Sequence, residues 1–178
     1  MIIGIGHIAQ TGKTTIANYL SRKYGFVSIS FADSLKKACK EIFHLSDEQV
    51  YGSLKEVVDS YWGVTPRFIL QKVGTECMRN MFDKDIWVKS ARAQTLKNPY
   101  INYVFPDCRF LNEVCAIKEW GGKLLRVTRP ICGATGGISG HASEVELIGF
   151  EGWDYTIHND GSFEDLYRKV DNFVKLVK

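Results

Sequence analysis

The sequence contains no long hydrophobic run. Its apolar stretches are all far shorter than the roughly 20 residues that a helix needs to cross a bilayer. The apolar opening already ends at Gly6, which makes it too short for a signal peptide. No internal repeat, low-complexity tract or linker divides the 178 residues. We therefore expect a single domain of ordinary size, outside any membrane.

Cysteines with disulfide or metal-site spacing are also missing. The chain has five cysteines, an odd number, and no C-x-x-C pair. This pattern argues against a disulfide framework and against a zinc site, and it favours a reducing compartment. The sequence therefore predicts a cytoplasmic protein.

Clusters of a single charge are scarce as well. The net charge is only +3, and no run of basic residues exceeds two. A nucleic-acid-binding surface needs a basic patch or stripe, so a polymer partner is not expected. The composition, 45% hydrophobic and 24% charged, is that of a soluble globular protein.

The chain does contain strands alternating with helices. Apolar runs typical of strands occur at 2–6, 26–31, 101–107, 123–127 and 155–157. Helical spacing occurs at about 13–24, from 34, from 65 to at least 81, at 85–96, 112–120 and 163–177. A capping box at 46–49 and the pair Thr65-Pro66 mark two helix starts. This alternation predicts a parallel sheet covered by helices on both faces.

Polar residues follow the predicted strands. They are the loop at 6–15, Asp33, Asp107, Arg109, Arg129, Asn159 and Asp160. Ligands of open parallel sheets bind at the carboxyl ends of the strands. We therefore expect these residues to gather at a ligand-binding edge.

The loop after the first strand, GHIAQTGKTT, is close to the phosphate-loop pattern G-x-x-x-x-G-K-[ST]. In this pattern Lys13 would bridge the outer phosphates, and Thr14 would ligate magnesium. The first glycine of the pattern is replaced by His7. Histidine tolerates positive φ better than most residues, and a specific role for its imidazole stays open. The alternative is a chance GKT at a helix start.

Further charged residues could handle a second phosphate. Arg67, Arg79 and Arg109 suit this, since a guanidinium binds phosphate with two parallel hydrogen bonds; each could instead be a solvated surface residue. Asp33 could orient or deprotonate an acceptor, hold magnesium through water, or simply cap a helix. Asp107 has the same ambiguity, and its place resembles that of the acid that ends a Walker B strand.

Aromatic and glycine-rich segments leave alternatives open. Phe31, Trp62 and Trp87 could stack on a base or lie in the core. The segment 130–142 is glycine-rich and could be a disordered loop or a lid that closes over a nucleotide. With Arg129 at its root, we favour the lid.

Seven strings follow one another along nearly the whole chain: GHIAQTGKTT, FADSLKKA, TPRFILQKVGTECMRN, DIWVKSA, PDCRFLNEVCAIKEWGGKLLRVTRP, HASE and HNDGSFEDL. In this order they resemble the phage-type deoxynucleoside monophosphate kinases, which have the P-loop nucleoside monophosphate kinase fold. Most of the specificity lies in D-x-R-F-x-N-E at 107–113 and T-P-R…G-T-E-x-x-R at 65–79.

The resemblance implies a three-layer α/β/α fold with a five-stranded parallel sheet. It also implies a helical substrate-binding region at about 34–98 and a lid at about 129–145. The implied activity is transfer of the γ-phosphoryl group of ATP, with Mg²⁺, to a deoxynucleoside monophosphate. The implied setting is the host cytoplasm if a phage encodes the chain, and a homodimer is possible. No nucleic-acid polymer or membrane is implied as a partner.

The resemblance also assigns residues. ATP would contact Ala9, Gln10, Thr11, Gly12, Lys13, Thr14, Thr15, Asn159 and Asp160, the last two beside adenine. The acceptor would contact Asp33, Lys36, Arg67, Gln71, Glu76, Arg79, Trp87, Arg109 and Glu113. The catalytic charges would be Lys13, Arg67, Arg79, Arg109 and Arg129. Magnesium would sit on Thr14, with Asp33 or Asp107 acting through water.

Two departures from the family pattern occur in the loop. His7 replaces the signature glycine, and Thr14 stands where many relatives have aspartate. The hydroxyl beside Lys13 restores the standard Walker form, which favours the magnesium assignment.

Two rival functions stay open. The same fold serves kinases of phosphomevalonate, dephospho-coenzyme A and other small phosphorylated acceptors. The chain could also be a nucleotide-binding switch that transfers phosphate to nothing, although a switch has no need of a second arginine-rich phosphate site.

Overall fold

A computed structural model of the chain describes residues 1–6, 11–130 and 146–177. Its contacts divide the chain into two compact units. The sheet unit comprises Met1–Ser30 and Thr95–Lys178, and the helical unit comprises Phe31–Gln94.

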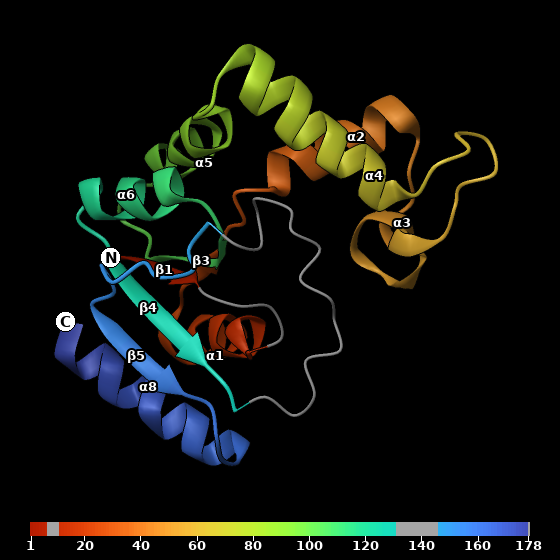
Figure 1. The fold of residues 1–178 in the computed structure, drawn as a ribbon. Helices are drawn as coiled ribbons and strands as arrows, with labels where there is room; N and C mark the ends of the chain where they lie inside the picture. Colours follow the sequence, from red (N-terminus) through yellow and green to blue (C-terminus); the bar gives the residue numbers. More distant parts are fainter. Residues whose placement is uncertain (7–10, 131–145, 178) are drawn as a thin grey trace. The chain divides into compact units, whose positions relative to one another are not determined.

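The sheet unit is built on parallel strands (Figure 1). They are β1 Ile2–Gly6, β2 Val27–Ser28, β3 Tyr103–Cys108, β4 Lys123–Thr128 and β5 Tyr155–His158. Their order within the described residues is β2-β3-β1-β4-β5, with every neighbouring pair parallel. The five-stranded parallel sheet predicted from the sequence is confirmed.

Helices cover both faces of this sheet. α1 Lys13–Tyr24 and α8 Phe163–Val177 share one core cluster with the strands, in which Ile3 and Ile5 of β1 are fully buried. The alternate residues of β1 face the other layer, because a Cβ added to Gly4 would lie 3.1 Å from Cγ1 of Ile117. Ile117 belongs to α6 Leu111–Glu119. The sequence IIGIG thus fits a central strand with bulky packing on one face and a close approach on the other.

β1 lies at the position where the strand order reverses. It pairs with β3 on one side and with β4 on the other, and its carboxyl end leads toward α1. Ligands of open α/β sheets bind outside such a switch point. The fold therefore places the predicted phosphate loop where this class of sheet binds its ligands.

The helical unit contains α2 Asp33–Phe43, α3 Asp47–Tyr51, a 3₁₀ turn η1 Ser53–Glu56, α4 Pro66–Gln71, a π-helix η2 Lys72–Phe82 and most of α5 Ile86–Lys97. Its core consists of Leu35, Cys39, Leu45, Val50, Ile69, Leu70 and Trp87. The predicted capping box is confirmed, since Ser46 and Gln49 exchange both of its hydrogen bonds. The predicted start of α4 is also confirmed, with Thr65 accepting from the Phe68 N–H and Pro66 in the first turn.

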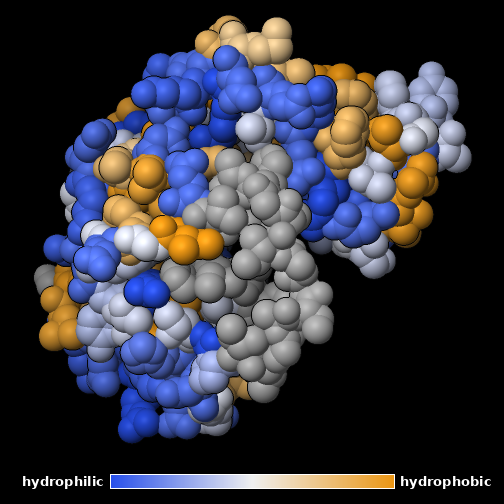
Figure 2. All heavy atoms as spheres, in the orientation of Figure 1, coloured by the Kyte–Doolittle hydropathy of each residue, from blue (hydrophilic) through white to orange (hydrophobic). Residues whose placement is uncertain are grey.

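The segment between α3 and α4 leaves apolar side chains exposed. Val57, Val58 and Tyr61 are 53%, 59% and 85% exposed. Figure 2 shows orange spheres at its right-hand edge, over the part of the chain that Figure 1 draws between these helices. These side chains therefore add little to the core of the helical unit.

Two elements differ from the sequence prediction. The strand expected at 26–31 is assigned only at Val27–Ser28, both exposed at the sheet edge. The helix expected to run on from Thr65 changes from α to π geometry at Lys72. Trp87 donates from Nε1 to the Gly74 carbonyl at 2.9 Å, and a side chain that bonds to a backbone carbonyl is one of the features that disturb a regular helix.

Among the helices that the structure describes, none combines the length and the apolar character that a membrane span requires.

Candidate active site

The phosphate loop is described from Thr11 onward. His7, Ala9 and Gln10 lie outside the described residues, so their predicted roles stay predictions. Gly12 has φ +101°, a left-handed conformation that favours glycine, and α1 begins directly after it at Lys13. Thr14 is exposed in the first turn, and Thr15 is partly buried. Free backbone N–H groups at a helix start attract anions, so this geometry suits phosphate.

The surroundings of Lys13 disfavour its positive charge. Burial lowers the pKa of Lys13 from its ordinary value of 10.5 to about 8, and the nearby positive charge of Arg109 lowers it too. Cys108 and Asp107 act in the opposite direction. A bound anion would favour the charged form of the amine, because its negative charge compensates for the water that the buried amine has lost. The site is therefore arranged to gain from a phosphate ligand.

Asp107 is held at the end of β3 by a neighbouring hydroxyl. The Oγ of Ser30 donates a hydrogen bond to Oδ2 of Asp107, and both residues belong to the sheet unit. Asp107 also lies near enough to Lys13 to affect its pKa. The carboxylate is thus oriented beside the phosphate loop, where the sequence predicted an acid.

A magnesium ion would find few protein ligands here. Within the described ranges, no group of three or more His, Cys, Asp or Glu side chains could hold a metal. Mg²⁺ in phosphate-transfer sites is usually held by one or two protein groups, substrate phosphates and water. The exposed Thr14 hydroxyl and the carboxylate of Asp107 fit that requirement.

Arg109 follows β3 and is exposed. Its backbone N–H donates to Oε2 of Glu113 at 2.8 Å, and the N–H of Phe110 donates to the same oxygen at 3.2 Å. Glu113 is only 2% exposed. Its carboxylate therefore holds the turn that presents Arg109, while its predicted contact with sugar or base stays a prediction.

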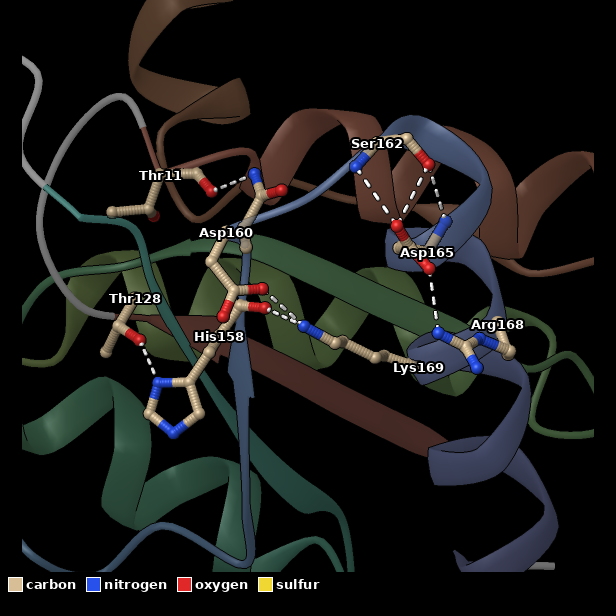
Figure 3. Close-up of polar contacts among 9 residues, drawn as sticks. Thr11, Thr128, His158, Asp160, Ser162, Asp165, Arg168 and Lys169 are labelled. Carbon is tan, nitrogen blue, oxygen red and sulfur yellow. Dashed lines mark hydrogen bonds and ion pairs between the residues drawn. The ribbon is translucent and has the colours of Figure 1, made fainter.

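The end of β5 contacts the phosphate loop. Asn159 donates from Nδ2 to the Thr11 carbonyl at 2.9 Å (Figure 3). Asp160 pairs with Lys169 at 2.6 Å, which lowers the pKa of its carboxyl. The structure thus brings Thr11 and Asn159 together, while their predicted contact with ATP stays a prediction. Their predicted position beside adenine is a separate matter and stays a prediction.

Arg129 is exposed directly after β4. The predicted lid at 129–145 lies outside the described residues apart from 129 and 130. Its closure over ATP therefore stays a prediction.

The predicted acceptor cations of the helical unit contact other groups of that unit. Arg67 donates from Nε to Oε1 of Glu56. Arg79 donates from Nη1 to the Lys84 carbonyl at 3.4 Å. Glu76 pairs with Lys72 one turn away on the π-helix. An acceptor phosphate would compete with these contacts for the arginines.

Asp33 and Lys36 lie on α2 near Tyr51. The Lys36 ammonium sits 4.7 Å from the centre of the Tyr51 ring, a cation–π contact. Burial raises the pKa of Tyr51, and the negative charge of Asp33 contributes. Gln71 closes α4 and is partly buried. The structure therefore brings Asp33 and Lys36 to one place but leaves their ligand contacts as predictions.

The aromatic candidates were left open between base stacking and the core. Trp87 and Phe31 are 7% and 3% exposed, so both occupy core positions. Trp62 is 38% exposed and donates from Nε1 to the Phe43 carbonyl at 2.9 Å. The core alternative therefore describes Trp87 and Phe31 as they lie in this structure.

Sequence reasoning missed two residues that contact the site. Ser30 was overlooked because the predicted second strand included it, whereas the assigned strand ends at Ser28 and leaves Ser30 beyond its carboxyl end. Trp153 packs against Gly6, where an added Cβ would clash with its ring. No periodicity or motif marks Trp153, so only the three-dimensional structure reveals it.

A family model and two relatives of known name agree on one family. A family model described as deoxynucleotide monophosphate kinase matches residues 44–170. The chain is 41% identical over 187 aligned residues to a protein of Acanthamoeba polyphaga mimivirus named "Putative deoxynucleotide monophosphate kinase", covering 96% of this chain and 94% of that one. It is 32% identical to the deoxynucleotide monophosphate kinase of Enterobacteria phage T4, over 67% of this chain and 48% of the phage protein. The chain thus spans about half the length of the phage protein.

Solved structures share the fold at lower identity. The dephospho-CoA kinase from Campylobacter jejuni aligns with a TM-score of 0.53 and 18% identity, covering 99% of this chain and 97% of that one. At this identity the likeness supports the P-loop kinase fold and says nothing about the acceptor. The three-layer α/β/α fold predicted from the sequence is confirmed.

Proposed function

Because the chain belongs to the deoxynucleotide monophosphate kinase family, we propose that it transfers the γ-phosphoryl group of ATP to a deoxynucleoside monophosphate. The observation that carries this proposal is the surroundings of Lys13. This lysine is partly buried at the start of α1, with its pKa lowered to about 8 by burial and by Arg109. An anion bound there would stabilise the positive charge that burial disfavours, and the triphosphate of ATP is such an anion.

The reaction breaks the bond between the γ-phosphorus and the oxygen that bridges it to the β-phosphate. A new bond forms between the γ-phosphorus and an oxygen of the acceptor phosphate, giving ADP and the deoxynucleoside diphosphate. The acceptor phosphate is already ionised near neutral pH, so no general base is needed. Catalysis therefore depends on positioning and on neutralising the charge of the transferred group.

The residues of the sheet unit would serve the ATP side. Lys13 would contact the outer phosphates, with the backbone N–H groups from Gly12 onward around them. When bound, Mg²⁺ would neutralise part of the phosphate charge, held by Thr14 and, through water, by Asp107. Arg109 would contact the transferred or the acceptor phosphate.

The residues of the helical unit would serve the acceptor. Arg67 and Arg79 would contact its phosphate, exchanging their present contacts with Glu56 and the Lys84 carbonyl for a phosphate oxygen. Asp33, Lys36, Gln71 and Glu76 belong to the same proposed acceptor set, whereas Trp87 would support it from the core.

The cellular setting is proposed from the cysteines. Cys39, Cys77, Cys108 and Cys115 are free thiols, and Cys77 and Cys115 are exposed. Exposed free thiols are compatible with a reducing compartment, which supports action in the cytoplasm.

A panel of acceptors tests the proposal. The protein is incubated with Mg-ATP and one acceptor at a time, and ADP release is followed. The panel contains the deoxynucleoside monophosphates, phosphomevalonate and dephospho-coenzyme A. We expect turnover with at least one deoxynucleotide and none with the other two. Turnover confined to a non-nucleotide acceptor would overturn the proposal, and ADP release independent of any acceptor would favour a nucleotide-hydrolysing switch.

A further inference from the structure

Asn159 contacts the phosphate loop at two consecutive residues. Its side-chain amide donates from Nδ2 to the Thr11 carbonyl at 2.9 Å (Figure 3). The same nitrogen lies 2.6 Å from the point where a Cβ of Gly12 would stand. A Cβ at position 12 would therefore push the amide away, and the φ of +101° at Gly12 independently favours glycine.

Asn159 is itself held on both sides. Its backbone N–H donates to the Thr128 carbonyl at 2.7 Å, which continues the pairing of β5 with β4. Lys169 of α8 donates to the His158 carbonyl and to Oδ1 of Asp160, each at 2.6 Å. Figure 3 shows Lys169 reaching these two neighbours of Asn159 from the helix. The amide is therefore placed by the sheet and by α8 and does not depend on a ligand.

The contact with Thr11 has a consequence for the next peptide N–H. The carbonyl of Thr11 and the N–H of Gly12 belong to one planar trans peptide, in which they point in opposite directions. A bond that holds the carbonyl toward Asn159 therefore turns the Gly12 N–H away from Asn159. Successive backbone N–H groups are the donors that surround phosphate in such loops.

We infer that Asn159 is a positioning residue for the triphosphate: its amide fixes the Thr11–Gly12 peptide so that the Gly12 N–H is presented to phosphate. The inference rests on the proposed function only in taking ATP as the ligand. It differs from the role that the family resemblance implies, in which Asn159 borders adenine. The two roles separate with a ligand that has phosphates and no base.

The test uses Asn159→Asp, which keeps the shape of the side chain. The carboxylate oxygen that replaces Nδ2 accepts and cannot donate, so it repels the Thr11 carbonyl. Affinities for Mg-ATP and for magnesium tripolyphosphate are measured by calorimetry at pH 7.5. We expect both affinities to fall by the same factor, about tenfold, which is the size of losing one partly buried hydrogen bond.

A matched control is Asn172→Asp. Asn172 is exposed on α8 and receives the same change of charge. Both affinities should stay within about twofold of the wild type, since the charge is exposed and screened. The pH adds a second readout, because a protonated aspartic acid can donate to the Thr11 carbonyl. The ratio of wild-type to Asn159→Asp affinity for tripolyphosphate should therefore shrink between pH 7.5 and about pH 4, where an aspartic acid is about half protonated.

An equal loss for both ligands supports the inference when Asn159→Ala, which adds no charge that could repel the phosphates, also weakens both equally. A loss for ATP with tripolyphosphate unchanged assigns Asn159 to adenine and overturns it, as does no loss for either ligand. If Asn159→Asp fails to fold by circular dichroism, Asn159→Ala takes its place, with a smaller loss again shared by both ligands. A wild-type protein that binds neither ligand would overturn the proposed function instead, which distinguishes the two failures.

Discussion

The sheet unit and the helical unit hold their cationic candidates differently. In the sheet unit, Lys13 is partly buried beside Arg109, and its pKa falls to about 8. In the helical unit, Arg67 is already paired with Glu56 at an exposed site. In the first arrangement burial disfavours the positive charge, and a bound anion would stabilise it. The second requires a ligand to displace an existing partner.

The two arrangements differ in how much binding free energy a phosphate gains at each cation. A site that holds a cation at a cost gains much from the first phosphate that binds, so it suits a donor that must be gripped tightly. Exposed ion pairs are worth little, so exchanging one for a phosphate costs little and gains little until other contacts form.

The largest effect is expected at Lys13. Lys13→Ala should lower turnover by about 10³-fold, because it removes a preorganised positive charge from the transferred phosphoryl group. Steady-state ADP release measures this. The midpoint of thermal unfolding should not fall, since the charged amine is disfavoured by burial. Activity within tenfold of the wild type would contradict the phosphate-loop assignment.

A smaller effect is expected in the helical unit. Arg67→Ala should raise KM for the deoxynucleotide about 30-fold, the size of one charged hydrogen-bond contact, and leave KM for ATP unchanged. Glu56→Gln should act in the opposite direction and lower the same KM by about twofold, because it removes a competitor for Arg67. Arg22→Ala, an exposed arginine of α1, is the control and should change neither constant. If Arg67→Ala changed KM for ATP as much as KM for the deoxynucleotide, the helical unit would not be specific to the acceptor, which would contradict the account.

Ser30→Ala probes the orientation of Asp107. Loss of the Ser30–Asp107 hydrogen bond should lower kcat about fivefold without changing KM for the acceptor. The dependence of kcat on magnesium concentration should shift to higher concentrations if Asp107 acts on the metal through water. Ser28→Ala, exposed on β2, is the matched control. An unchanged kcat for Ser30→Ala would show that Asp107 needs no such support.

The smallest predicted effect is the uptake of protons by Lys13 when ATP binds. At pH 8 the free protein holds Lys13 about half protonated, since its pKa is about 8. Bound phosphate raises that pKa, so ATP binding at pH 8 should take up about half a proton at this site. Calorimetry in buffers of different ionisation enthalpy measures the uptake. Lys13→Arg should show none from this site, because a guanidinium stays protonated. Because binding takes up protons, the affinity for ATP should fall as the pH rises above about 8.

The fold was largely predictable from the sequence. The run IIGIG, the helix from Lys13 to Tyr24 and the caps at Ser46 and Thr65 are local signals, and the structure has each of them. The π-helix at Lys72–Phe82 was not predictable, because the apolar spacing of a π-helix over so few turns resembles that of an α-helix. Its Gly74 carbonyl accepts from Trp87, a contact that no local pattern encodes.

The candidate site was predictable where it follows strands. Asp107 and Arg109 lie close enough to Lys13 to affect its pKa, as expected for residues at the ends of neighbouring parallel strands. Ser30 and Trp153 were missed because their roles depend on where β2 ends and on how the segment before β5 packs. The internal contacts of Arg67 and Glu76 were also beyond prediction, since exposed ion pairs have no sequence signature stronger than spacing.

The central claim is phosphoryl transfer to a deoxynucleotide, and one labelling experiment tests it most directly. ATP labelled with ³²P at the γ-position is incubated with the protein, Mg²⁺ and each deoxynucleoside monophosphate, and the products are separated by chromatography. We expect label in a deoxynucleoside diphosphate with the wild type, and none above background with Lys13→Ala. Label released only as inorganic phosphate would contradict the account, because the protein would then hydrolyse ATP without transferring its phosphoryl group to a nucleotide.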